Sequence, residues 1–433
     1  MEVALLYPEV YDMARYKEGR REFPPFGVLY LASVTAAAGH NVKILKVTPE
    51  NTALDLRAFD AIGFSLASSA TYGFMLEARR YSQFKKNVLI LVGGVHCNFY
   101  PEMSLTDFQA DVASYGESED TILEMLERAD SRSFGGIRGI VWRRNDAIIR
   151  EPPVTLIRDI DRLPLPARQL LPQADFVLND RLAGTDIRMA HTMFSRGCPF
   201  PCTFCAAGQT KIQYRSGQSA RLELEHLISQ YDIGGFAIVD DNFVVARKKV
   251  IDICDNIADL QLVWSALSRV DTVDEELLGH MARAGCIEIK FGMESGSEHL
   301  LKAMRKNTTQ EKIRRAIHMA NNAGINAKVF VIHGYPGENM ETTLETMHFL
   351  EELGSCISRV SLFRFVPLPG TQVYSQPDIR GTHLRPDWDG NWSKFHIHHN
   401  TLQWWGDKED WAELEQGHQL LRTFVEANWN TQG

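Results

Sequence analysis

The sequence predicts an α/β protein with two parallel-sheet domains, and three observations support this fold class. Short apolar stretches alternate with helical stretches over about the first 130 residues, a proline-rich segment follows, and the alternation resumes near Arg188. Alternating strands and helices are typical of a parallel sheet covered by helices. The chain has 433 residues, more than one hydrophobic core usually organises.

The first region contains several short strands separated by helices. Three of these strands are followed by small or polar residues, at 65–69, 93–96 and 116–119. Ligands of such sheets bind at the carboxyl ends of the strands, so we expect a ligand site there. The predicted strands are residues 3–7, 42–46, 61–66 and 88–92, and the predicted helices are residues 27–38 and 72–84.

A linker is predicted between the two regions, because five prolines lie between residues 151 and 172. We therefore divide the chain into a first domain at 1–135, a linker at 136–187, a barrel at 188–374 and a C-terminal extension at 375–433 that covers the barrel.

The second region repeats the strand–helix unit six times, which predicts a partial or full α/β barrel with its active site at the strand C-termini. The predicted strands are residues 190–195, 236–239, 263–267, 287–292, 327–332 and 360–365, and helices are predicted at 221–231, 275–284 and 311–323.

Composition restricts the class of protein. The net charge of −9 argues against a nucleic-acid binder, which would carry a basic surface. No apolar run reaches the roughly 20 residues that span a bilayer, and the N-terminus lacks the basic segment of a signal peptide. We expect a cytoplasmic protein that binds neither nucleic acid nor membrane.

Three cysteines form the strongest motif of the chain. Cys198, Cys202 and Cys205 have the spacing C-x3-C-x2-C and directly follow the first strand of the second region. Three thiolates around a [4Fe–4S] cube leave one iron open to a chelating small molecule, whereas most protein-bound cubanes use four cysteines. A structural zinc site, which needs a fourth ligand such as histidine, and a buried trio of thiols are the alternatives.

This motif, its place after a strand and the aromatic Phe204 before the last cysteine resemble the radical S-adenosylmethionine (SAM) superfamily, over roughly residues 188–374. The resemblance implies a partial (β/α)6 radical SAM barrel. It also implies that the cluster reductively cleaves SAM, and that the resulting 5′-deoxyadenosyl radical abstracts hydrogen from a small-molecule substrate. An external electron donor of the flavodoxin or ferredoxin type is implied as a partner.

The same resemblance implies which residues contact SAM. Phe204 belongs to the cluster loop, and the other candidates follow successive strands: Asp240, Asp241 and Asn242, then Ser268 and Arg269, then Glu294 and Ser295, then His333 and Gly334. Helix caps, surface ion pairs and tight turns are the alternative roles for these residues. Tyr214 and Arg215, just after the cluster loop, are candidate catalytic residues that face the substrate or only pack.

The first region resembles the cobalamin-binding domain fused to many radical SAM enzymes. The resemblance rests on residues 23–27, 93–96 and 115–119, and it implies a flavodoxin-like (Rossmann-type) sheet whose loops hold a corrinoid. The Asp-x-His-x-x-Gly signature of base-off mutases is absent. The resemblance of the domain nevertheless makes cobalamin a candidate cofactor. The alternative is a scaffold that no longer binds corrinoid. His96 is more simply a loop histidine satisfied by backbone than a cobalt ligand.

Two reactions remain open. Residues 375–433 contain six of the eight tryptophans and nine Asp/Glu against five Lys/Arg, a composition that suits either an aminosugar ligand or a hydrophobic lid. The short extension resembles the radical SAM diol dehydratases of apramycin-type aminoglycoside biosynthesis, which act with a partner reductase. We therefore expect a radical dehydration in antibiotic biosynthesis, with a cobalamin-dependent radical SAM C-methyltransferase as the alternative. A non-catalytic sensor would need a signalling module, and none is visible in the sequence.

Overall fold

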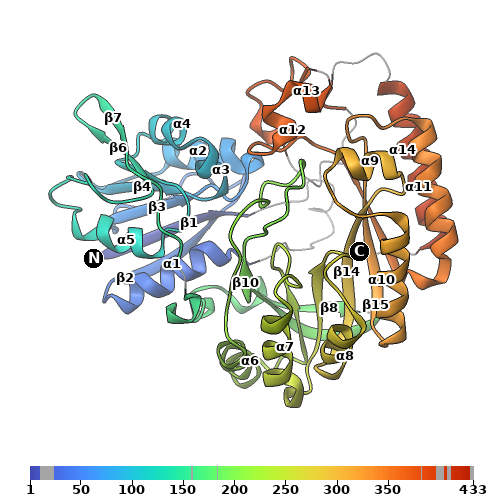
Figure 1. Ribbon diagram of the computed structural model, residues 1–433. Helices are drawn as coiled ribbons and strands as arrows, with labels where there is room; N and C mark the ends of the chain where they lie inside the picture. Colours follow the sequence, from blue (N-terminus) through green and yellow to red (C-terminus); the bar gives the residue numbers. More distant parts are fainter. Residues whose placement is uncertain are drawn as a thin grey trace. The chain divides into compact units, whose positions relative to one another are not determined.

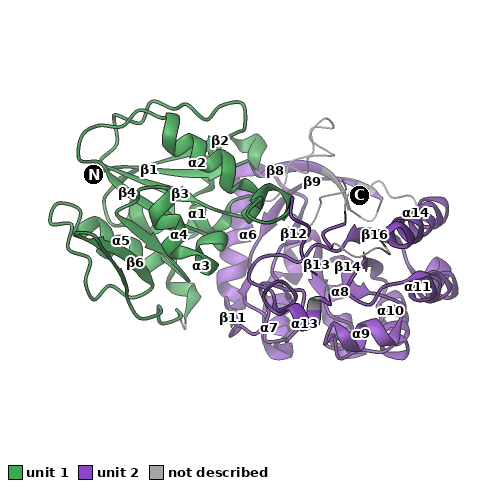
Figure 2. Cartoon of the chain, turned by 90° about the horizontal axis from the view of Figure 1, so that it is seen from above, with its two compact units in different colours: residues 1–175, 388–396 green, residues 176–387, 397–433 purple. Residues whose placement is uncertain are grey.

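The computed structural model describes residues 1–9, 24–157, 159–182, 184–381, 383–395, 404–406 and 411–429. These residues form two compact units (Figures 1 and 2). Unit 1 comprises Met1–Asp175 with Trp388–His396, and unit 2 comprises Phe176–Asp387 with Ile397–Gly433.

Unit 1 is built on a seven-stranded sheet of order β2-β1-β3-β4-β5-β6-β7. The first five strands are parallel, and β6 and β7 extend the sheet antiparallel. The order β2-β1-β3-β4-β5 is that of flavodoxin-like sheets, so the predicted fold class is confirmed for this unit. The strands are β1 (Glu2–Pro8), β2 (Asn41–Val47), β3 (Ala61–Ser65), β4 (Leu89–Gly93), β5 (Val112–Ser114), β6 (Ile140–Arg144) and β7 (Ala147–Arg150).

Continuous apolar runs explain why the central strands of unit 1 form. Every residue of β1 from Val3 to Pro8 is buried, as is typical of a parallel strand covered on both faces. The helices of this unit are α1 (Phe26–Ala37), α2 (Tyr72–Tyr81), α3 (Val95–Phe99), α4 (Pro101–Asp107) and α5 (Glu119–Glu127).

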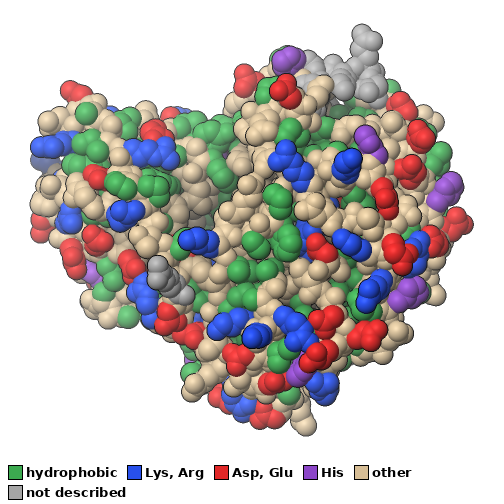
Figure 3. All heavy atoms as spheres, viewed as in Figure 1, with side chains coloured by type: hydrophobic (Ala, Val, Ile, Leu, Met, Phe, Trp, Pro, Cys, Tyr) green, Lys and Arg blue, Asp and Glu red, His purple; other side chains and the backbone are tan. Residues whose placement is uncertain are grey.

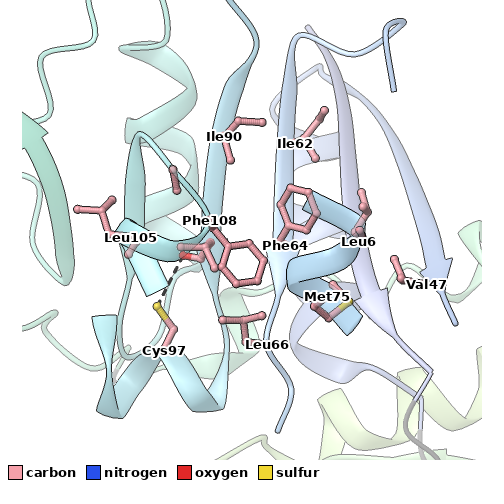
Figure 4. Packing of buried hydrophobic residues seen from close by; sticks show 14 of the residues in the cluster. Leu6, Val47, Ile62, Phe64, Leu66, Met75, Ile90, Cys97, Leu105 and Phe108 are labelled. Atoms are coloured by element: carbon pink, nitrogen blue, oxygen red, sulfur yellow. Dashed lines mark hydrogen bonds between the residues drawn. The ribbon is translucent and has the colours of Figure 1, made fainter. Parts of the chain in front are cut away.

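The core of unit 1 lies between the sheet and the helices that follow β3 and β4. Phe64 and Phe108 pack edge to face with ring centroids 5.6 Å apart, and Leu6, Ile62 and Ile90 surround them (Figure 4). Cys97 belongs to this core, as expected for a cysteine outside the cluster motif. This packing fixes the carboxyl ends of β3 and β4, where the candidate corrinoid loops begin.

Unit 2 is built on a second seven-stranded sheet, of order β16-β15-β14-β13-β12-β9-β8. Strands β9 and β12 to β16 run parallel, and β8 pairs antiparallel with β9. Six parallel strands in an open order confirm the predicted partial barrel. The strands are β8 (Val177–Leu182), β9 (Thr185–Thr192), β12 (Gly235–Ile238), β13 (Val263–Ser268), β14 (Cys286–Glu294), β15 (Asn326–His333) and β16 (Arg359–Arg364).

Side-chain caps begin most of the barrel helices. Ser216, Asp274 and Thr309 each accept a hydrogen bond from a backbone N–H of the first turn, and Asn339 forms a capping box with Thr342. The helices are α6 (Gly217–Tyr231), α7 (Arg247–Ile257), α8 (Glu275–Arg283), α9 (Glu298–Ala303), α10 (Gln310–Asn322), α11 (Met340–Leu353), α12 (Gln372–Ser375), α13 (Pro377–Arg380) and α14 (Trp411–Asn428).

The structure differs from the sequence prediction in the linker. Residues 136–187 contain β6, β7 and β8, which are paired in the two sheets. The five prolines lie between β7 and β8, where the described residues include three short 3-10 turns. The high proline content therefore predicted that a connection between the two regions lies here, but it did not predict the residues at which the connection begins and ends.

The C-terminal extension is also divided. Its segment around the 3-10 turn η8 (Trp392–Lys394) belongs to unit 1, where Trp392 lies 4.9 Å from the His96 ring, whereas α14 packs on α11 and β16 of unit 2. The described part of the extension is thus divided between the two units and does not form a cover over the barrel alone. His396, His398 and His399 lie outside the described residues.

The surface carries charges of both signs. On the face shown in Figure 3, Lys and Arg side chains are interspersed with Asp and Glu side chains. In the part of the chain that the structure describes, no helix has the length and apolar character needed to cross a membrane.

Candidate cluster and cofactor sites

The three cysteines lie on one loop that a small hairpin closes. Strand β10 (Ser195–Arg196) pairs antiparallel with β11 (Gln213–Tyr214), and the loop between them carries all three thiols. Within the loop, the amide of Cys205 donates to the carbonyl of Cys202 at 3.2 Å. The loop follows the carboxyl end of β9, which is where the sequence predicted it.

Thr210 and Gly197 hold the start of the loop in place. The hydroxyl of Thr210 accepts from the Cys198 amide at 2.8 Å, and the Thr210 amide donates to the Cys198 carbonyl at 2.9 Å. Gly197 has φ +86°, and a Cβ there would lie 2.4 Å from the carbonyl oxygen of Lys211. Only glycine tolerates both conditions, so this residue brings the two arms of the hairpin together.

The far side of the loop is fixed by residues distant in sequence. The amide of Thr203 donates to the Met304 carbonyl at 3.1 Å, and the hydroxyls of Thr203 and Tyr335 share a hydrogen bond of 2.7 Å. Tyr335 also donates to the Ala303 carbonyl at 3.2 Å. The loop is thus anchored to the end of α9 and to the segment after β15.

The thiols suit an iron–sulfur cluster chemically. Burial raises the pKa of the Cys205 thiol to about 11 and also raises the pKa of the Cys198 thiol. Buried thiols of this kind lose their protons when a cluster binds them as thiolates, because the iron supplies the compensating charge. The buried guanidinium of Arg269 lies beside the thiol of Cys202.

Arg269 contacts the cluster loop rather than open solvent. Its Nη1 donates to the Sγ atom of Cys202 at 3.3 Å, and its guanidinium carbon lies 4.0 Å from the ring centroid of Phe200. Nε and Nη2 each donate to a carboxylate oxygen of Asp271 at 2.8 Å. The structure therefore brings Arg269 to the cluster loop, but the Nε and Nη2 atoms of its guanidinium already bind the Asp271 carboxylate.

The three residues after β12 take different roles. Asp240 is buried and accepts from the Phe194 amide at 2.9 Å and from the Ser195 hydroxyl at 2.6 Å, and burial raises its pKa to about 8. Asp241 is exposed. Asn242 is buried, and neither atom of its side-chain amide has a hydrogen-bond partner among the described residues. An unpaired buried amide at a strand end fits a polar ligand, as predicted for the SAM site.

Glu294 pairs with a lysine that the sequence did not bring to attention. The Lys306 ammonium lies 2.5 Å from Oε1 of Glu294, and both side chains are buried. The same ammonium lies 5.8 Å from the ring centroid of Phe204. The backbone carbonyl of Lys306 accepts a hydrogen bond from Arg269. Lys306 thus connects the end of β14 with the cluster loop.

Ser268 and Ser295 serve the backbone in this structure. The Ser268 hydroxyl donates to the Arg269 carbonyl at 3.0 Å. The Ser295 hydroxyl accepts from the Ser297 amide at 3.0 Å and shares a hydrogen bond with Thr346. These contacts shape the turns after β13 and β14.

His333 and Gly334 lie under the C-terminal extension. The Nε2 atom of His333 lies 2.9 Å from the Thr343 hydroxyl, and burial lowers the pKa of His333 to about 3. Gly334 has φ +93°, and a Cβ there would lie 1.8 Å from the Trp404 ring. Glu338 accepts from the Gly334 amide at 3.3 Å, and burial raises its pKa to about 7.

Tyr214 and Arg215 are engaged by the fold. The Tyr214 hydroxyl donates to the Phe243 carbonyl at 2.5 Å and accepts from the Val245 and Ala246 amides at 3.2 Å. Arg215 is buried, and its Nη1 donates to the Ser219 hydroxyl at 2.9 Å. These contacts support the packing alternative for both residues rather than contact with a substrate.

Unit 1 has a cradle of small residues where a corrinoid is expected. A Cβ on Gly93 would lie 2.5 Å from the Ser114 hydroxyl, and one on Gly94, which has φ +101°, would lie 2.8 Å from the Leu66 carbonyl. His96 is buried behind them, with Nδ1 bonded to the Ser69 hydroxyl at 2.9 Å and Nε2 without a partner in the described ranges. A side chain rather than the backbone binds Nδ1 of this histidine, and the close packing of the strand ends requires glycine at both positions. Phe23 lies outside the described residues.

Comparison with known proteins identifies the family. The model of the radical SAM superfamily matches residues 192–350, and the model of the B12 binding domain matches residues 18–126. An uncharacterized methyltransferase of Pyrococcus horikoshii is 30% identical over 379 residues, which cover 84% of this chain and 81% of that protein. The chain belongs to the radical SAM superfamily. Radical SAM proteins bind a [4Fe–4S] cluster and SAM, and the B12 binding domain supports cobalamin as a further cofactor.

Further relatives of this radical SAM protein carry two kinds of name. An anaerobic magnesium-protoporphyrin IX monomethyl ester cyclase of Rubrivivax gelatinosus is 25% identical, covering 87% of this chain and 70% of the relative. A cytidylyl-2-hydroxyethylphosphonate methyltransferase of Streptomyces wedmorensis is 26% identical, covering 81% of this chain and 77% of the relative.

Solved structures agree with the fold. The methyltransferase TsrM from Kitasatospora setae, with cobalamin and a [4Fe–4S] cluster bound, superposes with a TM-score of 0.66 at 19% identity, covering 86% of this chain and 73% of TsrM. The cobalamin-dependent radical enzyme OxsB gives a TM-score of 0.72 at 15% identity, covering 99% of this chain and 67% of OxsB.

Proposed function

We propose that this radical SAM protein is a cobalamin-dependent C-methyltransferase acting on a small molecule. The observation that carries the proposal is the match of most of this chain to a relative named a methyltransferase, together with its B12 binding domain. A second methyltransferase relative, from Streptomyces wedmorensis, supports the same reaction class.

These relatives favour methyl transfer over the dehydration that the extension suggested. None of the relatives described above is named a dehydratase, and the aromatic, acidic extension on which that expectation rested is divided between the two units. Methyl transfer also gives the B12 binding domain a chemical role, which a cobalamin-free dehydration does not.

The chemistry needs two SAM molecules. When bound, the cluster supplies the electron that cleaves SAM to methionine and a 5′-deoxyadenosyl radical, and cobalamin supplies the methyl group taken from a second SAM. In such a reaction the methyl group would take the place of the hydrogen atom removed from the substrate carbon, and the products would be the C-methylated substrate, 5′-deoxyadenosine, methionine and S-adenosylhomocysteine. An external donor of the flavodoxin or ferredoxin type delivers the electrons in this proposal.

Residues of the chain hold these components. Cys198, Cys202 and Cys205 would ligate the cluster, and Gly197 shapes the loop that presents them. The amide of Asn242 offers a donor and an acceptor to the polar part of SAM, since it has no partner in the described chain. Lys306 orients Glu294 at the end of β14 through their ion pair.

The test is an anaerobic reconstitution with iron and sulfide, followed by incubation with SAM and a low-potential reductant, with and without cobalamin. A methyltransferase should form S-adenosylhomocysteine only when cobalamin is present. It should form 5′-deoxyadenosine only when the cluster is present.

The two readouts separate the reactions. A dehydratase would form 5′-deoxyadenosine at the same rate with and without cobalamin and would produce no S-adenosylhomocysteine. That result would contradict the proposed methyl transfer while leaving the radical SAM assignment in place.

A further inference from the structure

Arg269 lies where it can act on the cluster itself. It follows β13 directly, its side chain is only 5% exposed, and its Nη1 is 3.3 Å from the Cys202 sulfur. The ring of Phe200, from the cluster loop, stacks against the same guanidinium. The charged group is thus both close to this sulfur and largely shielded from water.

The guanidinium has little capacity left for another partner. Nε and one Nη2 hydrogen bind Asp271, the second Nη2 hydrogen binds the Lys306 carbonyl, and one Nη1 hydrogen points at Cys202. Arginine has five such hydrogens, so a single N–H remains. The sequence suggests that Arg269 contacts SAM, and a bidentate clamp on the SAM carboxylate would be one such contact. That clamp would require both hydrogen bonds to Asp271 to break.

Hydrogen bonds and positive charge near the ligating sulfurs are known determinants of cluster potential. A reduced cluster carries one more negative charge than an oxidised one. A fixed guanidinium beside a ligating thiolate therefore stabilises the reduced form more than the oxidised form, and it makes the cluster easier to reduce. The effect is large in a buried site because solvent screens it poorly.

We infer that Arg269 is a positioning residue that raises the reduction potential of the cluster through its hydrogen bond to the Cys202 sulfur, with Asp271 fixing its orientation. The step it assists is the transfer of one electron from the external donor to the oxidised cluster. This inference rests on the cluster of the radical SAM family and is independent of whether the later chemistry is methyl transfer.

The experiment compares three reconstituted variants with the wild-type protein. Arg269→Gln removes the charge and the hydrogen bond, and Arg269→Lys keeps the charge but loses the fork on Asp271. Arg247→Gln is the matched control, because Arg247 is an arginine of the same unit whose ion pairs with Asp274 and Glu276 lie on a partly exposed surface. The midpoint potential of the cluster is measured by redox titration followed by electron paramagnetic resonance, with iron and sulfide content as the check on assembly.

The inference predicts a more negative midpoint potential for Arg269→Gln, a smaller negative shift for Arg269→Lys and no shift for Arg247→Gln. If Arg269→Gln fails to assemble a cluster, the shift in the midpoint potential of Arg269→Lys tests the inference instead. Equal potentials in the Arg269 variants and the wild type would overturn the inference. So would unchanged potentials accompanied by weaker SAM binding, which would restore the SAM contact that the sequence suggests.

Discussion

Single residues fix the cluster loop with few contacts each. Thr210 binds both backbone atoms of Cys198, Tyr335 holds Thr203, and Gly197 allows the hairpin arms to approach. None of these residues is a candidate ligand, yet each fixes a part of the loop that carries the thiols. The three candidate ligands could be picked out from the sequence, because three cysteines within eight residues directly after a strand form a specific pattern.

Removal of one ligand should abolish radical formation. Cys202→Ala leaves two thiolates for the cube, so we expect loss of most bound iron and of all 5′-deoxyadenosine. Cys356→Ala is the control, since Cys356 is only partly buried and lies outside the motif. Iron and sulfide analysis with a SAM-cleavage assay gives the answer, and retention of activity in Cys202→Ala would contradict the ligand assignment.

Glu338 should make stability depend on pH. Burial raises its pKa to about 7 from an ordinary value of 4.5, so the folded state holds a proton that the unfolded state has lost between these values. Stability contributed by this group is therefore fully present below the unfolded pKa and decreases as pH rises to 7, by up to about 3 kcal/mol. Glu338→Gln should flatten the free energy of unfolding between pH 5 and 7 in urea titrations, whereas Glu351→Gln, at an exposed position of α11, should not.

Contacts at the ends of a helix and along one packed face hold it in position. Helix α14 shows this, because Leu421 and Val425 are buried and the Trp429 indole donates to the Ile357 carbonyl at 3.1 Å. An ion pair joins Arg364 of β16 to Glu415 of α14. The C-terminal helix is thus an integral part of unit 2.

The packing of α14 can be tested with two neighbouring leucines. Leu421 is 0% exposed and Leu420 is 41% exposed. Leu421→Ala should lower the stability of unit 2 by about 3 kcal/mol, while Leu420→Ala should change it by less than about 0.5 kcal/mol. Thermal or urea unfolding measures both, and equal effects would show that α14 does not pack as described.

At the scale of the whole molecule, periodicity and turn residues predicted both sheets, but not the pairs that long-range packing creates. The strands of the partial barrel followed from apolar runs between helical segments, whereas the flavodoxin-like order was implied by the resemblance of the first region to cobalamin-binding domains. Lys306 and Asp271 were not found, because their roles depend on partners at Glu294 and Arg269 that only the fold brings close. The division of the extension was missed for the same reason: Trp392 resembles any surface aromatic until His96 is placed beside it.

A substitution in unit 1 should weaken cobalamin binding without affecting the cluster of unit 2. Gly94→Ala places a Cβ 2.8 Å from the Leu66 carbonyl at φ +101°, so we expect cobalamin affinity to fall about tenfold or more. Cluster content and 5′-deoxyadenosine formation should survive, because the cysteines belong to unit 2. Gly73→Ala is the control, since a Cβ there would meet no atom within 4 Å.

Cobalamin retained after desalting and 5′-deoxyadenosine formed per cluster measure these two properties separately. Parallel loss of both in Gly94→Ala would show that the change disrupts the fold more widely than unit 1.

The closed hairpin of β10 and β11 has a consequence for how the holoprotein matures. All three iron ligands belong to one short excursion of the chain, and its base is held by the pairing of Ser195 with Tyr214 and Arg196 with Gln213. Opening that base leaves every strand of the large sheet paired. Iron and sulfide would therefore need to reach a single loop to load the site, and the large sheet would not need to open.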